Sequence, residues 1–230
     1  MQPLPAPSKQ PDRRALVLAS SSPRRRAFLR ELGLECELHS ADIDETPLPG
    51  ETPAPLALRL ATAKARRVAD RLLEEARPEP ALIIAADTVV ALQGQLLGKP
   101  TDAAEARAML AALRGRDHQV ISAVSLLDTA SGRQIGRVND TLVTMRLYSN
   151  EEIAAYIETG DPFDKAGAYA IQHPVFRPVS AVAGCIAGVM GLPLADLRDL
   201  LAEFGVEIAV PLAPICRGHT HFPCCQETTT

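Results

Sequence analysis

Runs of apolar residues and alternating patterns divide the chain into short strands and amphipathic helices. The apolar runs at residues 15–19 and 81–86 predict two strands, and the second run is apolar on both faces, as in the centre of a sheet. Between them, residues 56–76 repeat apolar positions at helical spacing, which predicts a long amphipathic helix. Alternation at residues 118–127 and 137–147 predicts two further strands joined by a turn.

Capping residues and shorter patterns predict the remaining elements. They are a helix from Pro23 to about Gly33, a strand at 35–40, a strand at 89–97 bent at the hairpin Gln93–Gly94, a helix from Thr101 to Leu113 with Thr101 as its cap, a helix from Ser149 to Thr159 with the capping box Ser149 and Glu152, and a last helix from Leu194 to Phe204. Hairpins and crossovers occur together, so we expect an α/β fold with a mixed, twisted sheet and flanking helices. Residues 15–210 form the expected domain, residues 1–14 a disordered Pro-rich tail, and residues 211–230 a flexible tail.

Composition excludes several classes of protein. Of the 230 residues, 47% are hydrophobic and 23% are charged, as in an ordinary globular protein. No apolar run reaches the roughly 18 residues of a membrane span, and the N-terminus has no signal-peptide pattern, so we expect no membrane association and a cytoplasmic location. A net charge of −4 and 3% aromatic residues argue against a nucleic-acid partner. The apolar C-terminal half is compatible with a homodimer.

The five cysteines do not form a predicted disulfide framework, because their number is odd and no secretory signal precedes them. Residue types that bind metals are concentrated near the C-terminus, at Cys216, His219, His221, Cys224 and Cys225. Little apolar sequence surrounds them, so a frayed end is the default expectation.

The segment from Leu18 to Arg26 carries three serines and three arginines at a strand-to-helix turn. Serine hydroxyls and free N–H groups at a helix N-terminus bind anions, and guanidinium groups match phosphate geometry. Pro23 suits the first turn of that helix. On this segment alone, Ser20 can equally be an ordinary N-cap and the arginines a solvated helix face.

Asp87 is the single most informative residue, because a carboxylate at the end of an apolar strand needs a cation, a metal or a catalytic role. A capping or turn aspartate remains the alternative. Arg24, Arg25, Lys99 and Lys165 lie beside turn residues. Together with the acidic loop at residues 42–45, they suggest a triphosphate and a divalent cation such as Mg²⁺. The familiar phosphate-loop, zinc-protease and serine-hydrolase motifs are absent from the sequence.

These pieces resemble, in order, the Maf family of nucleoside triphosphate pyrophosphatases. The matching stretches are Leu18–Arg25, Asp44–Glu45, Arg59–Ala61 with Lys64–Ala65, Ala86–Val89, Gly98–Pro100, Asp164–Tyr169 with Ile171–Gln172, and Gly191–Leu194. Each stretch alone is weak, but seven in family order span almost the whole chain. The resemblance implies an elongated, two-lobed fold similar to inosine triphosphate pyrophosphatases, with a central cleft and cleavage between the α and β phosphates.

The resemblance also implies roles for individual residues. Asp87 is the expected catalytic base, and Glu45 and Asp87 are the expected contacts of a divalent metal, Mg²⁺ or Mn²⁺. Arg24, Thr88 and Gln172 match the family branch that takes dTTP and UTP. The expected phosphate-binding residues are Ser20, Arg25, Lys64, Lys99 and Lys165.

Two other functions compete with hydrolysis of dTTP and UTP. One is the same hydrolysis of purine or modified nucleotides such as 7-methyl-GTP. The other is a nucleotide-binding regulator of cell division with little turnover, against which the intact Asp87 and lysines argue.

Overall fold

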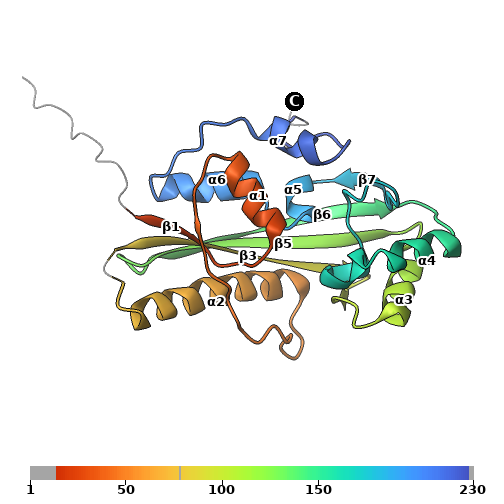
Figure 1. The fold of residues 1–230 in the computed structure, drawn as a ribbon, viewed down its shortest axis with the longest axis horizontal. Coiled ribbons are helices and arrows are strands. Elements are labelled where there is room, and N and C mark those ends of the chain that lie inside the picture. Colours follow the sequence, from red (N-terminus) through yellow and green to blue (C-terminus); the bar gives the residue numbers. More distant parts are fainter. Residues whose placement is uncertain (1–13, 78, 228–230) are drawn as a thin grey trace, which may run out of the picture.

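The long apolar segments form three long strands at the centre of a mixed sheet. A computed structural model of the chain describes residues 14–77 and 79–227. In it β3 (Ala81–Leu92), β5 (Asp117–Asp128) and β6 (Gln134–Met145) are each 12 residues long, about 40 Å at the usual rise per residue. They pair antiparallel and give the molecule its elongated shape (Figure 1).

The other elements extend this sheet or cover it. The remaining strands are β1 (Ala15–Leu18), β2 (Glu37–Leu38), β4 (Gln95–Leu97) and β7 (Val179–Ala183). The helices are α1 (Pro23–Glu31), α2 (Pro53–Glu74), α3 (Ala103–Leu113), α4 (Asn150–Glu158), η1 (Asp161–Asp164), η2 (Ala166–Ala168), α5 (Ile186–Val189), α6 (Leu194–Glu203) and α7 (Leu212–His219). The strand order is β2-β1-β3-β5-β6-β7, with β4 paired to β3. Because β1 pairs parallel with both of its neighbours and the other pairs are antiparallel, the predicted mixed α/β sheet is confirmed.

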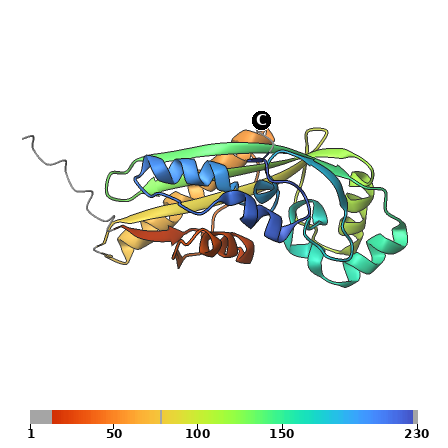
Figure 2. The same ribbon diagram turned by 90° about the horizontal axis from the view of Figure 1, so that it is seen from above.

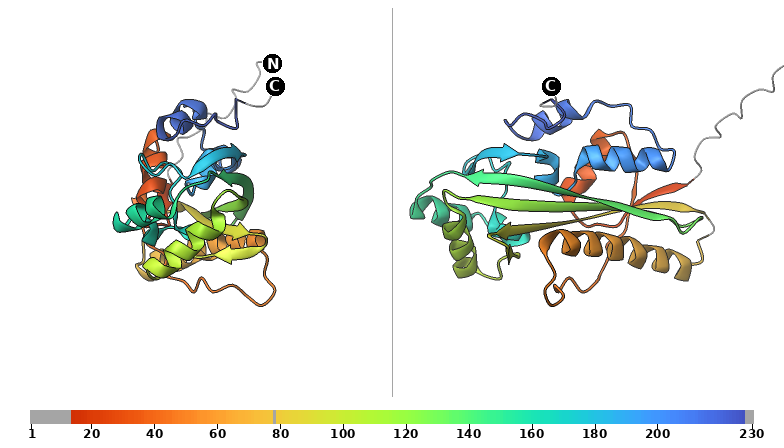
Figure 3. Two further views of the ribbon diagram at one scale, coloured as in Figure 1. Left: turned by 90° about the vertical axis from the view of Figure 1, so that its right-hand side faces the viewer. Right: turned by 180° about the vertical axis from the view of Figure 1, so that it is seen from behind.

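Helices cover both faces of the sheet. Helix α2 lies along one face, while α1, α5 and α6 lie on the other, and α3 and α4 gather at one end (Figures 1 and 3). Helix α6, seen from above in Figure 2, packs against β5 and β6. Along β3, Leu82 and Ile84 belong to the main core, whereas Ile83 and Ala85 pack in the cluster under α2. The strand is therefore buried on both faces, as its apolar sequence predicts.

Two local predictions are wrong. Asp87 does not end a strand: it lies in the middle of β3, opposite Ala123 of β5, because the apolar runs on either side of it belong to one strand. Asp102, not Thr101, caps α3, since its carboxylate accepts the N–H of Glu105 at 2.8 Å. The Thr101 hydroxyl instead donates to the carboxylate of Glu105 at 2.7 Å.

The segment after residue 210 is built differently from the predicted flexible tail. It contains α7, and it buries Leu212, Cys216, Phe222 and Cys224 in the main core. Leu212 and Cys216 are four positions apart and share one helix face, so the short helix has an apolar side that packs inward. The predicted disorder of residues 1–13, and any at 228–230, lies outside the described residues. Among the helices that the structure describes, none is long and apolar enough to cross a membrane.

Candidate active site

All ten predicted site residues line one cavity of about 390 Å³. Six separate parts of the chain bring them together: the turn from β1 into α1, the loop before α2, α2 itself, β3, the turn after β4, and the segment around η2. The ten are Ser20, Arg24, Arg25, Glu45, Lys64, Asp87, Thr88, Lys99, Lys165 and Gln172. The structure therefore brings the predicted residues together, while the role of each side chain stays a prediction.

The ammonium of Lys64 joins the two carboxylates of the site. Its Nζ lies 2.6 Å from Oδ1 of Asp87 and 2.6 Å from Oε1 of Glu45. Lys64 and Asp87 are buried, whereas half of the Glu45 side chain is exposed. Burial alone would raise the pKa of Glu45, but the hydrogen bond and charge of Lys64, helped by Lys99 and Arg25, lower it overall. Both carboxylates therefore converge on one position that already attracts a cation.

Arg25 holds the turn between β1 and α1 in place. Its Nε donates to the carbonyl of Gly191 at 2.8 Å, and its two terminal nitrogens donate to Ser20 Oγ at 3.2 Å and Thr88 Oγ1 at 3.4 Å. Burial lowers the pKa of Arg25, and the charge of Asp87 opposes that shift. All three acceptors are neutral, so no carboxylate among them offsets the charge of this guanidinium.

Two serine hydroxyls in the turn between β1 and α1 make different contacts. Ser22 is the N-cap of α1, where its Oγ accepts the N–H of Arg25 at 3.5 Å. Ser20 is not that cap: its Oγ accepts from the N–H of Ser22 at 3.2 Å and from the Arg25 guanidinium. The ordinary N-cap interpretation of Ser20 is therefore wrong, and its hydroxyl faces the cavity with Arg25.

Two hydroxyl groups connect Thr88 to the backbone of α5. Thr88 Oγ1 and Ser122 Oγ are 2.7 Å apart, and Ser122 donates to the carbonyl of Gly188 at 2.7 Å. Because Ser122 donates its only proton to Gly188, Thr88 is the donor in the shared bond. The rotation of the Thr88 hydroxyl is thus fixed by its neighbours.

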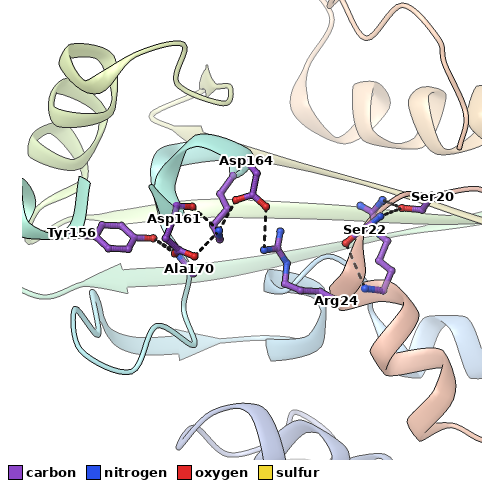
Figure 4. A network of polar contacts seen from close by, with 9 residues as sticks. Ser20, Ser22, Arg24, Tyr156, Asp161, Asp164 and Ala170 are labelled. Atoms are coloured by element: carbon purple, nitrogen blue, oxygen red, sulfur yellow. Dashed lines mark hydrogen bonds and ion pairs between the residues drawn. The ribbon is translucent and has the colours of Figure 1, made fainter. Parts of the chain in front are cut away.

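Lys165 is held by two aspartates that the sequence prediction did not include (Figure 4). Its Nζ donates to the carbonyl and to Oδ1 of Asp161 at 2.6 and 3.0 Å, and it also bonds to Oδ1 of Asp164. Asp164 faces Arg24 of α1 as well, at 3.9 Å. This network connects α1 with η1. It also pairs the positive charges of Lys165 and Arg24 with carboxylates in the ligand-free protein.

Lys99 and Gln172 differ from the other predicted residues in the contacts of their side chains. Lys99 is exposed and Gln172 half-buried, and within residues 14–77 and 79–227 neither side chain has a hydrogen-bond or ion-pair partner. Both face the cavity, so both can meet a ligand without first giving up a protein contact.

The cavity carries excess positive charge. Five cationic side chains line it, namely Arg24, Arg25, Lys64, Lys99 and Lys165, against the carboxylates of Glu45, Asp87 and Asp164. The chain as a whole has a net charge of −4. A local excess of cations within an acidic protein attracts an anionic ligand.

The donor set also suits a hard divalent cation. Glu45 and Asp87 supply two converging carboxylates, and across the described part of the chain there is no group of three or more acidic, histidine or cysteine side chains arranged for a metal. Mg²⁺ is commonly bound through one or two carboxylates, with phosphate oxygens and water completing its shell. The residues present therefore fit a metal that arrives with a phosphorylated substrate.

Sequence reasoning missed Ser122, Asp161, Asp164 and the carbonyl of Gly191. Asp164 could have been found, since it precedes Lys165 in one of the matching stretches. Ser122 lies in a strand without any sequence signal, and only the pairing of β5 with β3 brings it opposite Thr88.

The fold and the cavity define an α/β protein with a cation-lined cleft suited to a polyphosphate ligand. The family described as Maf-like protein matches residues 15–204. The chain belongs to the Maf family, which confirms the resemblance found in its motifs.

Relatives of the chain carry a common name. A dTTP/UTP pyrophosphatase from Pelotomaculum thermopropionicum is 45% identical over 193 residues, covering 84% of this chain and 98% of that protein. A protein of the same name from Thermomicrobium roseum is 48% identical over 209 residues, covering 88% and 91%. A third, from Anaeromyxobacter dehalogenans, is 46% identical over 83% of this chain and 94% of its own.

One solved structure is similar at a greater distance. It is a nucleoside-triphosphatase, described as a dITP/XTP pyrophosphatase, from Mycobacterium abscessus, with 19% identity and a TM-score of 0.35 over 57% of this chain and 74% of that one. This similarity is too weak to support a conclusion about function.

Proposed function

We propose that this protein hydrolyses dTTP and UTP to the nucleoside monophosphate and pyrophosphate. The observation that carries the proposal is the cation-lined cavity around the Asp87–Lys64 pair, in a chain that belongs to the Maf family. Relatives named dTTP/UTP pyrophosphatase, 45–48% identical over most of the chain, support the choice of nucleotide.

Asp87 is the proposed general base. Its carboxylate is buried, faces the cavity, and keeps one oxygen, Oδ1, on Lys64. The other oxygen can take a proton from the water that attacks the α phosphorus. The cations hold the triphosphate, and they offset the negative charge that develops on the leaving pyrophosphate.

Arg24, Thr88 and Gln172 are proposed to select the pyrimidine. A glutamine amide offers one donor and one acceptor face, and the imide edge of uracil and thymine offers the complementary pair. The Thr88 hydroxyl has its own proton committed to Ser122, so toward a base it acts as an acceptor. Sites that hydrogen-bond a base reject one that leaves those groups unpaired.

Glu45 and Asp87 would hold the divalent cation, Mg²⁺ or Mn²⁺. When bound, such a cation polarises phosphoryl oxygens and neutralises their charge. Lys64 forms ion pairs with both carboxylates, so in the free protein its positive charge offsets the repulsion between them.

The direct test is release of pyrophosphate from dTTP, UTP, CTP, GTP and 7-methyl-GTP, with Mg²⁺, with Mn²⁺ and with a chelator. We expect metal-dependent release from dTTP and UTP above the others, and loss of release in Asp87→Asn. Release mainly from a purine nucleotide would refute the pyrimidine pocket. Tight binding without release would favour a nucleotide-binding regulator.

A cytoplasmic location is part of the proposal, supported by nucleoside triphosphates as substrates and by cysteines that are free thiols in the structure. Cell fractionation tests it. Light scattering on the purified protein tests the proposed homodimer.

A further inference from the structure

Four of the five cysteines lie in the main hydrophobic core or pack against it. Cys185 directly precedes α5, Cys216 lies in α7, and Cys224 and Cys225 follow α7. Three of the four lie beyond residue 204, where the match to the Maf family ends. All four belong to or pack against the main core, so the C-terminal segment carries its thiols inward onto Cys185.

The four thiols are linked by a series of contacts. The Cys185 and Cys225 side chains are hydrogen-bonded to each other, and so are those of Cys216 and Cys224. Cys225 also accepts a hydrogen bond from Cys224. The fifth cysteine, Cys36, is half-buried and has no thiol partner in the described residues, which makes it a matched control.

Cys225 and Cys185 differ in the way that a reactive thiol differs from its resolving partner. Cys225 is half-exposed, and the hydrogen bond from Cys185 lowers its pKa to about 6. Cys185 is buried, and its contact with Cys225 together with burial raises its pKa. Redox-active cysteines are typically accessible thiolates that lie next to a second, protonated thiol.

The pair is attached to the cavity through α5. The N–H of Gly188 donates to Sγ of Cys185 at 3.3 Å, and the carbonyl of Gly188 accepts from Ser122. Val189, Met190 and Gly191 then line the cavity itself. A covalent change at Cys185 therefore acts on the segment that forms one wall of the site.

We propose that Cys225 and Cys185 form a peroxide-responsive dithiol, whose disulfide ties the C-terminal segment to α5. The Cys225 thiolate attacks one oxygen of a hydroperoxide, which is reduced; with one proton taken up, water or an alcohol leaves and Cys225 becomes a sulfenic acid. Cys185 then attacks that sulfur, the S–S bond forms, and the sulfenic oxygen leaves as water with the Cys185 proton. In total, two thiols are oxidised by two electrons and one peroxide is reduced.

A soft metal ion is the other common use of four thiols. In the part of the chain that the structure describes, no cysteine, histidine or acidic residues form a group of three arranged for a metal. This finding favours a disulfide over a metal site.

The experiment is titration of the full-length, freshly reduced protein with hydrogen peroxide. Free thiols are counted under denaturing conditions, cross-linked peptides are mapped by mass spectrometry, and metal content is measured beforehand. We compare the wild type with Cys225→Ser, Cys224→Ser and Cys36→Ser. None of these readouts depends on nucleotide hydrolysis, so the result stands apart from the proposed function.

We expect the wild type and Cys36→Ser to lose two thiols at one equivalent of peroxide and to form a 185–225 cross-link within one chain. Cys224→Ser keeps the cross-link, Cys225→Ser abolishes it, and a thiol reductant restores both thiols. Three results would each overturn the proposal: a cross-link that persists in Cys225→Ser, oxidation of Cys225 to the sulfinic acid without a cross-link, or stoichiometric zinc that protects all four thiols.

Discussion

Replacing Lys64 by methionine tests the electrostatic centre of the cavity. Each contact of the ammonium at 2.6 Å has a gross attraction of about 6 kcal/mol at an effective dielectric constant of 20, most of which offsets the cost of burying the charges. Without Lys64, Asp87 stays buried and unpaired, whereas the half-exposed Glu45 returns to water. Breaking a buried pair costs about 3–5 kcal/mol, and because the cavity is open to water we expect the lower end, about 3 kcal/mol of unfolding free energy.

A double-mutant cycle isolates the pair. Asp87→Asn leaves Lys64 its contact with Glu45, so we expect a loss of only about 1 kcal/mol. The double variant has no unpaired buried charge, and we expect it to lose about 2 kcal/mol, less than the sum of the single losses. The coupling energy is then about 2 kcal/mol.

The assay is urea unfolding followed by far-ultraviolet circular dichroism, because the chain has no tryptophan. Arg67→Met on the exposed side of α2 is the control, with an expected change within about 0.5 kcal/mol. If the two single losses add to the double loss within about 0.5 kcal/mol, Lys64 and Asp87 are not coupled and the reasoning fails.

Four further predictions concern residues of the core and of the cavity. Gly184→Ala should lower the unfolding free energy by about 2 kcal/mol or more, since its φ is +135° and a Cβ would lie 2.7 Å from Thr141 Oγ1; unchanged urea unfolding would contradict this. Burial lowers the pKa of His118 to about 4. Below about pH 6.5 the unfolded chain therefore binds a proton at this histidine, whereas the folded chain binds it only near pH 4. Stability is therefore lost as pH falls through this window, by about 2 kcal/mol from His118 between pH 7 and pH 5, and urea midpoints at both pH values should show a smaller loss in His118→Phe. Among the described residues, Tyr169 is the one hydrogen-bond partner of the buried His118 ring, at 2.7 Å, so Tyr169→Phe should cost about 1–3 kcal/mol of unfolding free energy that the double variant with His118→Phe partly recovers. Arg25→Lys cannot span the three acceptors that the guanidinium reaches, and steady-state kinetics should show kcat/KM for dTTP falling at least about tenfold with little change in urea unfolding.

Most of the fold could be predicted because its strands and helices carry strong local signals. The capping box of Ser149 and Glu152 forms as predicted at the start of α4. The strand at residues 35–40 is shorter than predicted, because only Glu37 and Leu38 pair with β1 at the edge of the sheet. The error at Asp87 has a physical cause as well: a carboxylate interrupts an apolar pattern in the same way in mid-strand as at a strand end, and only Lys64 from α2 shows why it is tolerated there.

The sequence motifs named residues that the structure brings to one cavity, but not the hydrogen-bond and ion-pair partners of those residues. The motifs identified Lys165 and Arg24, yet only the structure shows Asp161 and Asp164 placed against them. The prediction of a flexible tail at residues 211–230 missed α7 for a related reason. The sequence of this segment contains too few apolar residues to predict a buried helix. Its cysteines can be recognised as buried only when the structure shows that they contact Cys185 and the core.

The most direct test of the account is hydrolysis of dTTP in water enriched in oxygen-18, followed by mass spectrometry of both products. Attack of a water activated by Asp87 on the α phosphorus predicts the label in the nucleoside monophosphate and none in the pyrophosphate. Label in pyrophosphate, or release of labelled orthophosphate, would place the attack on another phosphorus and contradict the proposed reaction.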